Sequence, residues 1–350
     1  MKSILVISYA DSVDGSQLSL RLATKYWSNE LGWEVDVIHP NLKKFENVSD
    51  LLNVGMNPIE KVPIGKSYEF VLINSVLNME WAGIIKNTPM VLWIHEGYSM
   101  LSVLDPHQNL VKNLFSRLSS VLVSTEYQAV VVYKEYLHNV AKEKIHLVPY
   151  AIGSLNKSYP KRERADSDPF VISWLGSIIP RKRPMDLVWA GSILKNLINM
   201  RIEFIGPMIG EHQLVKEFAQ IRHLQNSRIT WYDVLPHDLA LELISKSDVF
   251  CFTSEDESTG LAPLESASLN IPVVLANLPI YQYIGWKDQH NCLMYPVGDI
   301  EQLKNCILKV HNDKLLVEKI TRNAYSLAQE FHPSKFLEKI TNAVSIKTEH

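Results

Sequence analysis

The chain has 350 residues, about twice the size of a typical domain, so a single small module is excluded. Hydrophobic residues make up 46% and charged residues 21%, which is an ordinary globular composition and excludes a mainly disordered chain. The formal net charge is −3, so no overall positive field would hold nucleic acid or an anionic membrane. A phosphate-bearing ligand must therefore be bound by a local site.

Cysteine usage and hydropathy indicate the compartment. Cys251, Cys292 and Cys306 form neither a CxxC pair nor a Cys/His zinc pattern, which favours a reduced, cytosolic chain. The start of the chain lacks the apolar region of a signal peptide, and no apolar run reaches the ~18 residues that span a bilayer. We expect a cytoplasmic protein without a nucleic-acid partner, compatible with peripheral contact at the inner face of a membrane.

The first part of the chain predicts strands that alternate with helices. Apolar residues recur at helical spacing over Gln17–Leu31, with Leu18, Leu22, Tyr26 and Leu31 near one face, and Gly32 ends this helix. The strand-like runs are Ile4–Tyr9, Trp33–Ile38, Phe70–Asn74, Val91–His95, Val121–Ser124 and Ile145–Pro149. Most of them are continuous apolar runs, which is typical of a parallel sheet buried on both faces.

The alternation stops and then resumes. Residues 153–169 hold Gly, Ser, Pro and mixed charges with almost no large apolar side chain, which predicts a linker. The strands expected after it are Phe170–Leu175, Arg201–Ile205, Ile229–Trp231, Val249–Thr253 and Pro272–Ala276, and the helices are Met185–Asn196, Leu239–Ser245, one starting near Pro263, and a last one near Pro333–Ile346. Two doubly wound α/β units follow from this pattern, and such units bind ligands at the carboxyl ends of their strands.

The most informative segment is Ser254–Val274, which follows a predicted strand and enters a helix with Pro263 near its first turn. Such a turn aims free backbone N–H groups and the positive end of a helix dipole at one spot, which is an anion site for a phosphate. Glu257 and Glu265 flank the turn, and a carboxylate accepts hydrogen bonds from vicinal hydroxyls. Glu265 on a ribose and Glu257 on a sugar would bracket a bound diphosphate. The alternative is that Glu257 caps the helix and Glu265 is a solvated surface carboxylate.

This segment resembles the EX7E region of retaining GT-B glycosyltransferases, glycosyltransferase family four in particular, whose usual form is Ser-x-x-Glu-Gly-Phe-Gly-Leu-Pro-x-x-Glu-Ala. The matching residues are Glu257, Gly260, Leu261, Pro263 and Glu265. The resemblance implies that Glu257 contacts the donor sugar and Glu265 the ribose of the nucleotide. It also implies that the backbone of Thr259, Gly260 and Leu261 meets the diphosphate. Ser258 and Thr259 replace the common Gly and Phe, so the sugar pocket departs from the family pattern.

Trp174–Pro184 resembles the family's strand and loop Gly-Arg-x-x-x-x-Lys, with Gly176 and Lys182 in the matching places. The family's Arg is Ser177 here, although that Arg and the Lys usually share the charge of the departing phosphate. Arg181 or Arg183 of the same loop is expected to supply the missing guanidinium, because guanidinium suits bidentate phosphate contact. The alternative is that these adjacent cations form a solvated loop.

Two residues of the first part also match the family. His95 ends a predicted strand, and the resemblance implies that it lies near the donor sugar; the alternative is a packed, satisfied histidine. Gly15 lies in the first strand-to-helix turn, which corresponds to the family's Gly-rich loop near the diphosphate or acceptor, or supplies a tight turn alone.

The sequence predicts no metal site and no cofactor apart from the donor, which is a substrate. Asp166 and Asp168 form a DxD pattern, but the pattern precedes a strand instead of ending one, so we interpret it as linker. No His/Asp/Glu cluster has metal-ligand spacing, and Gly206–Gly210 lacks the GxGxxG pattern of dinucleotide oxidoreductases.

The resemblance implies an α/β GT-B fold with two Rossmann-like domains that face a central cleft. Residues 1–155 would bind the acceptor, residues 156–330 the nucleotide-sugar donor, and residues 331–350 would return to the first domain. The implied activity is a retaining, metal-independent hexosyl transfer from a nucleotide-diphosphate sugar to a hydroxyl of a saccharide or lipid-linked saccharide, in cell-surface polysaccharide or glycolipid biosynthesis. Glu257, Lys182 and His95 would form the catalytic set. Two alternatives stay open: a sugar-nucleotide epimerase of the same fold, and a non-catalytic glycosyltransferase-like partner subunit.

Overall fold

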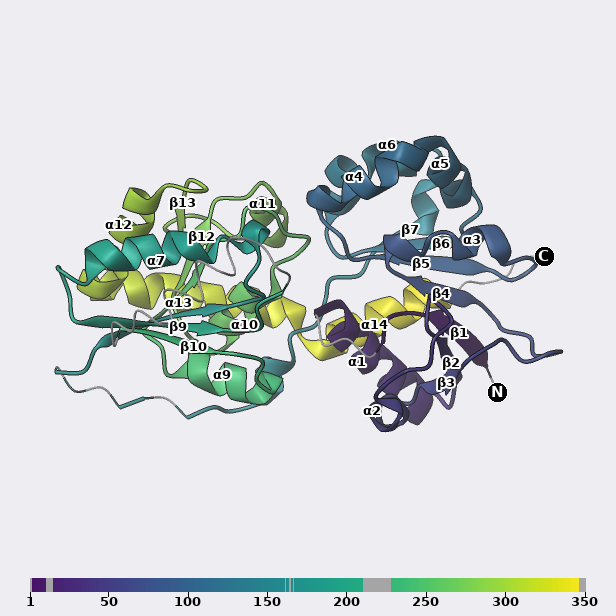
Figure 1. Ribbon diagram of the computed structural model, residues 1–350, viewed down its shortest axis with the longest axis horizontal. Coiled ribbons are helices and arrows are strands. Elements are labelled where there is room, and N and C mark those ends of the chain that lie inside the picture. Colours follow the sequence, from purple (N-terminus) through teal and green to yellow (C-terminus); the bar gives the residue numbers. More distant parts are fainter. Residues whose placement is uncertain are drawn as a thin grey trace. The chain divides into compact units, whose positions relative to one another are not determined.

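The structure is a computed structural model in which the chain divides into two compact units (Figure 1). It describes residues 2–10, 15–160, 162–163, 165, 167–209 and 228–345. The first unit is Met1–Ala151 with Pro333–His350, and the second is Ile152–His332. The chain thus passes between the units after residues 151 and 332, where the sequence analysis expected borders after residues 155 and 330.

The described part of the first unit holds a parallel sheet of seven strands in the order β3-β2-β1-β4-β5-β6-β7. The strands are β1 (Ser3–Ile7), β2 (Glu34–Ile38), β3 (Asn57–Ile59), β4 (Val71–Asn74), β5 (Met90–Ile94), β6 (Ser120–Val123) and β7 (Ile145–Leu147). Every residue of β4, β5 and β6 is buried. Helices cover both faces of such a sheet, which is why these strands are continuous apolar runs and do not alternate with polar residues.

Helices connect these strands and complete the first unit. They are α1 (Gly15–Asn29), α2 (Val48–Asn53), α3 (Trp81–Ile84), α4 (Leu101–Leu104), α5 (Gln108–Ser116), α6 (Lys134–Leu137) and α14 (Pro333–Val344). Helix α14, yellow in Figure 1, lies beside α1 although the two are far apart in the sequence. The Trp27 indole N–H donates a 3.0 Å hydrogen bond to Thr341 Oγ1, and the Phe336 ring stacks on Trp93. The last helix of the chain is therefore part of the core of the first unit.

The buried face of α1 differs from the expected one. Leu18 is 38% exposed, whereas Leu20, Ala23 and Trp27 are fully buried. The expected face was wrong because a second apolar stripe, Leu20, Ala23 and Trp27 at i, i+3 and i+7, faces the core instead. Trp27 also stacks on Trp33, the residue before β2.

The described part of the second unit holds a parallel sheet of six strands in the order β10-β9-β8-β11-β12-β13. The strands are β8 (Phe170–Leu175), β9 (Met200–Ile205), β10 (Ile229–Tyr232), β11 (Val249–Phe252), β12 (Val273–Ala276) and β13 (Leu293–Tyr295). In both sheets the strand order runs outward in two directions from a central pair, as in doubly wound folds. The carboxyl ends of β8 and β11 are neighbours, and this adjacency builds the site described below.

The helices of the second unit are α7 (Pro184–Leu194), α9 (His237–Ser245), α10 (Leu261–Ser268), α11 (Ile280–Ile284), α12 (Ile300–Asn312) and α13 (Lys314–Ala328). Asp299 and Asp313 cap α12 and α13, since each side chain accepts a hydrogen bond from a backbone N–H of the first turn. Proline opens α7 at its first position, where its missing N–H does no harm.

Strands β3 and β13 were not predicted, although β7, which also has three residues, was found within the predicted run Ile145–Pro149. The expected linker begins with a short 3-10 turn, Gly153–Asn156, and its residues 161, 164 and 166 lie outside the described residues. Among the helices that the structure describes, none is long and apolar enough to span a bilayer.

Candidate functional site

Two loops meet at the carboxyl edge of the second sheet. The loop at 176–183 follows β8 and the loop at 253–260 follows β11, and these strands are parallel neighbours. Backbone and hydroxyl groups join the loops: Glu255 N–H donates to the Arg181 carbonyl at 3.0 Å, and the Thr253 hydroxyl donates to the Lys182 carbonyl at 2.7 Å. The Trp174 indole N–H in turn donates to the Thr253 hydroxyl. The basic loop is thus held at a fixed place beside the Glu257 loop.

Lys182 and Glu257 form a buried ion pair between the two loops. The Lys182 ammonium bonds Glu257 Oε1, and the two side chains are only 15% and 8% exposed. Burial is the main influence on the Lys182 pKa and lowers it; the Glu257 carboxylate opposes this effect, and the Arg181 cation adds to it. The ammonium also lies 4.7 Å from the centre of the Phe252 ring. Glu257 does not cap α10: the N-cap residue is Gly260, and among the described residues the Glu257 carboxylate is bonded by Lys182 and Arg181.

The two arginines of the loop have different surroundings. Arg181 Nη1 donates to the Asp256 carbonyl and lies 3.4 Å from Glu257 Oε1. Arg183 instead forms two hydrogen bonds with Asp186, at 2.8 and 3.1 Å, and one with Glu255 at 3.2 Å. The bonds to Asp186 raise the pKa of the Arg183 guanidinium. The structure therefore brings Arg181 and Lys182 together at Glu257 and binds Arg183 to two other carboxylates, Asp186 and Glu255.

Helix α10 begins at the Gly260 turn. Gly260 has φ +74°, a left-handed conformation that favours glycine, and Leu261 is the first helical residue. Neither of their N–H groups donates to any residue that the structure describes, as expected for the first turn of a helix. The neighbouring Thr259 is buried. The buried Tyr281 hydroxyl, which the sequence analysis missed, would lie 3.6 Å from a Cβ at Gly260 and bonds to no described residue.

Two glycines allow the first loop to leave the sheet. A Cβ at Gly206, where φ is +129°, would lie 2.2 Å from the carbonyl oxygen of Gly176. Gly176 directly follows β8, and Gly206 follows the adjacent β9, so the two backbones touch where the loops diverge. The sequence analysis identified Gly176 by resemblance and gave Gly206 no role.

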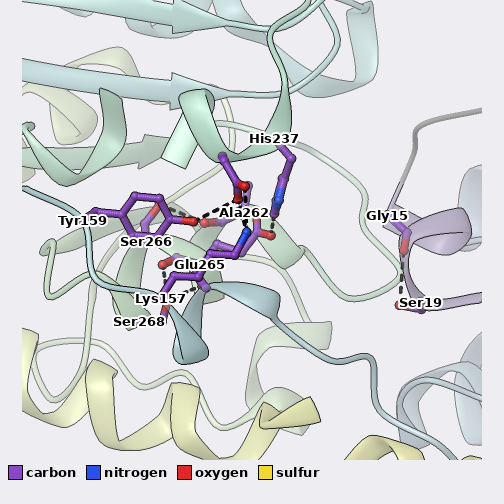
Figure 2. A network of polar contacts seen from close by, with 11 residues as sticks. Gly15, Ser19, Lys157, Tyr159, His237, Ala262, Glu265, Ser266 and Ser268 are labelled. Carbon is purple, nitrogen blue, oxygen red and sulfur yellow. Dashed lines mark hydrogen bonds and ion pairs between the residues drawn. The ribbon is translucent and has the colours of Figure 1, made fainter. Parts of the chain in front are cut away.

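Glu265 lies in α10, and its side chain is only 8% exposed, so it is not a solvated surface carboxylate. Its Oε1 lies 2.7 Å from Nε2 of His237, the first residue of α9 (Figure 2). The hydrogen bond to Glu265 is the main influence on the His237 pKa and raises it, against the opposing effect of burial. No motif in the sequence pointed to His237, because its partner lies 28 residues further along the chain.

Three further polar side chains lie near this contact (Figure 2). Lys157 Nζ bonds both carboxylate oxygens of Asp238, at 2.6 and 2.7 Å, and the Tyr159 hydroxyl donates to Asp238 at 3.2 Å. Burial, together with the charges of Asp238 and Glu265, raises the pKa of Tyr159 to about 12. The Asp238 charge is thus balanced by Lys157, and His237 is left to pair with Glu265.

The first unit carries a separate polar network at the carboxyl ends of β1, β4 and β5. His95 Nε2 lies 2.7 Å from Asn74 Oδ1, and its Nδ1 contacts the Tyr150 hydroxyl. Asn74 donates to the Ser8 hydroxyl, which donates to Gln17 at 2.8 Å. His95 is half-buried and bonded on both ring nitrogens, so its orientation is set by its neighbours.

Gly15 is the first residue of α1, and its carbonyl accepts a 3.2 Å hydrogen bond from the Ser19 hydroxyl (Figure 2). The preceding Asp14 lies outside the described residues, as do Asp166 of the DxD pattern and Gly210. In the part of the chain that the structure describes, no three His, Cys, Asp or Glu side chains are gathered as a metal ion would require.

The two parallel α/β units define the GT-B fold, and known structures share it over the whole chain. HepE from Anabaena, solved with UDP and glucose, superposes with a TM-score of 0.80 at 18% identity, covering 99% of this chain and all of HepE. Sucrose-phosphate synthase from Thermosynechococcus elongatus gives a TM-score of 0.75 at 16% identity and covers 98% of each chain. At this level of identity the likeness concerns the fold alone.

Sequence comparison narrows the class for the second unit. Residues 156–327 match the model of the family described as glycosyl transferases group 1. O-antigen biosynthesis glycosyltransferase WclY of Escherichia coli is 32% identical over 130 residues, which are 36% of this chain and 31% of WclY. Serotype-specific mannosyltransferase WbdA of Escherichia coli is 24% identical over 172 residues, 47% of this chain and 20% of WbdA. The matched segments therefore span less than a third of these curated relatives.

Proposed function

We propose that the protein is a glycosyltransferase that moves a sugar from a nucleotide-diphosphate sugar to a hydroxyl group of a saccharide or lipid-linked saccharide, in the assembly of a surface polysaccharide. The observation that carries this proposal is the start of α10, where the backbone N–H groups of Gly260 and Leu261 donate to no described residue and follow closely in sequence on Glu257 of the buried Lys182–Glu257 pair. The group 1 family match over residues 156–327 and the names of the E. coli relatives support the same class of reaction.

The second unit is proposed to bind the donor, with each group in a role suited to its chemistry. The start of α10 and the cations Arg181 and Lys182 receive the diphosphate, since a helix N-terminus and neighbouring cations stabilise an anion. Glu265 accepts hydrogen bonds from the ribose hydroxyls, and Glu257 from the sugar. Donor binding would then share Lys182 between Glu257 and the phosphate.

The first unit is proposed to bind the acceptor, and His95 to contact the transferred sugar. During transfer the acceptor oxygen forms a bond to the anomeric carbon while the bond from that carbon to the phosphate oxygen breaks. The electron pair of the broken bond stays on the phosphate, and the acceptor proton passes to the same phosphate. Negative charge therefore grows next to Lys182 and α10, where fixed cations and dipoles are most effective. We propose attack from the face of the departing phosphate, with retention of the anomeric configuration.

No cofactor or metal enters the proposed reaction, because the phosphate charge is assigned to Lys182, Arg181 and the start of α10. We place the protein in the cytoplasm, with a peripheral membrane contact where the acceptor is lipid-linked. The three cysteines are free and buried, in keeping with a reducing compartment.

A thermal-shift panel of nucleotide sugars tests donor binding. We expect at least one nucleotide sugar to raise the melting temperature of the wild type and to lose most of that effect in Glu265→Ala. Glu318→Ala is the matched control, because Glu318 is an exposed carboxylate on another helix of the same unit. Absence of any stabilising nucleotide sugar, or an equal shift in Glu265→Ala, would contradict the assignment.

A further inference from the structure

His237, at the start of α9, and Glu265, in the middle of α10, meet over a single contact. His237 is the first residue of α9, and Glu265 lies in α10; the two helices pack on each other. The contact joins His237 Nε2 to Glu265 Oε1 at 2.7 Å, while Glu265 Oε2 takes no hydrogen bond from any residue that the structure describes. An ionised carboxylate has about four acceptor positions, so one oxygen remains available in full.

The backbone around Glu265 is independently held. The Ser268 hydroxyl donates to the Glu265 carbonyl at 2.6 Å and lies 2.5 Å from the Ser154 hydroxyl. The Ser266 hydroxyl donates to the Ala262 carbonyl in the same helix (Figure 2). These bonds secure the course of α10, but none of them involves the Glu265 carboxylate. Among the described side chains, only the imidazole of His237 hydrogen-bonds that carboxylate.

The other charges near this contact are already paired. Asp238 follows His237 in α9 and is bonded by Lys157 and Tyr159. A carboxylate that competed for the His237 ring would have to leave Lys157 first. Among its described neighbours, Glu265 is therefore the carboxylate that hydrogen-bonds the His237 ring.

We propose that His237 is a positioning residue for nucleotide recognition: it holds one oxygen of Glu265 so that the other oxygen is presented to the vicinal hydroxyls of a ribose. This inference rests on the proposed donor-binding function and adds a residue to it. His237 does not touch the ribose in this account. Its effect is to select ribonucleotides over 2′-deoxyribonucleotides through the orientation of Glu265.

The test is calorimetric titration of the full chain with UDP and GDP and with their 2′-deoxy forms. The wild type should bind one of the two ribonucleotides about tenfold or more tightly than its deoxy form, because the deoxy form leaves a buried carboxylate oxygen without a donor. His237→Ala should lose most of this preference, as Glu265→Ala should. His237→Gln should keep much of it, since the glutamine amide can donate to the same oxygen.

The exposed His290 supplies the control, and His290→Ala should keep the wild-type preference. A wild-type preference in His237→Ala, together with its loss in Glu265→Ala, would overturn the role of His237 and leave the proposed function intact. A preference retained in Glu265→Ala would overturn the ribose contact itself. Failure of the wild type to bind either diphosphate would count against the proposed function. Circular dichroism checks that each variant is folded. If His237→Ala does not fold, loss of the ribonucleotide preference in a folded His237→Gln variant overturns the role of His237, and its retention supports that role.

Discussion

The three adjacent cations of the loop after β8 are equivalent in the sequence but have different partners in the fold. Lys182 is buried against Glu257, whereas Arg183 holds the buried Asp186. Lys182→Ala should lower turnover about a hundredfold or more, because it removes a cation from the place where phosphate charge grows. Arg183→Ala should lower stability by about 1–3 kcal/mol, since Asp186 loses its partner, and change turnover only a few-fold.

Steady-state turnover and thermal unfolding of both variants check this contrast. Equal loss of turnover in both variants would show that Arg183 takes part in the chemistry.

His237 makes stability depend on pH. Its folded pKa is raised, chiefly by the hydrogen bond to Glu265, while Asp238 raises it further and burial and Lys157 lower it. Its stabilising effect is therefore complete below the unfolded value of about 6.5 and is lost as pH rises through the folded pKa. The melting temperature of the wild type should exceed that of His237→Gln by more at pH 5.5 than at pH 8.5. A difference independent of pH would contradict the charged pairing.

At the scale of local elements, glycines occupy several tight turns for two different reasons: a left-handed backbone conformation, or the close approach of another backbone. Three glycine variants distinguish these reasons. Gly32 and Gly260 have φ of +66° and +74°. A Cβ at Gly32 would meet nothing within 4 Å and one at Gly260 would make only ordinary contacts at 3.6 Å, whereas a Cβ at Gly206 would clash with the Gly176 carbonyl. Gly32→Ala and Gly260→Ala should each cost about 1–2 kcal/mol for the left-handed conformation. Gly206→Ala should cost more, because the backbone itself must move.

Chemical denaturation of the three variants gives the order of their free energies of unfolding. A Gly206→Ala variant as stable as Gly32→Ala would show that the Gly176–Gly206 contact yields easily. For Gly260→Ala we also expect weaker nucleotide binding, since the turn sets the direction of the first N–H groups of α10.

The helices and strands that the sequence predicted are those with a long or unbroken pattern. Strand β8 has the predicted bounds, Phe170–Leu175, because six consecutive apolar or small residues fill a buried strand. The face of α1 was wrong, because Leu20, Ala23 and Trp27 are chosen by packing on the sheet and on α14. Strands β3 and β13 owe their existence to pairing with a neighbouring strand, which no local pattern records.

For the molecule as a whole, the two α/β units could be predicted from the repeated β-α alternation, and the GT-B fold from the resemblance of the Ser254–Val274 segment to a known family; the strand order within each sheet was not predicted. The residues of the candidate site that lie in motifs, such as Lys182 and Glu257, could be predicted as well. Their contact could not, because it joins loops 75 residues apart. His237 and Tyr281 were missed for the same reason: each matters through a neighbour that is distant in the sequence.

The most direct test of the proposed activity is to identify the products formed from the best stabilising nucleotide sugar and a saccharide acceptor, by mass spectrometry and proton NMR. The account predicts free nucleoside diphosphate and an acceptor that has gained one sugar with the anomeric configuration of the donor. Both products should depend on Lys182. An isomerised nucleotide sugar without release of the diphosphate would identify an epimerase, and an unchanged donor with every acceptor would identify a non-catalytic subunit; either result contradicts the account.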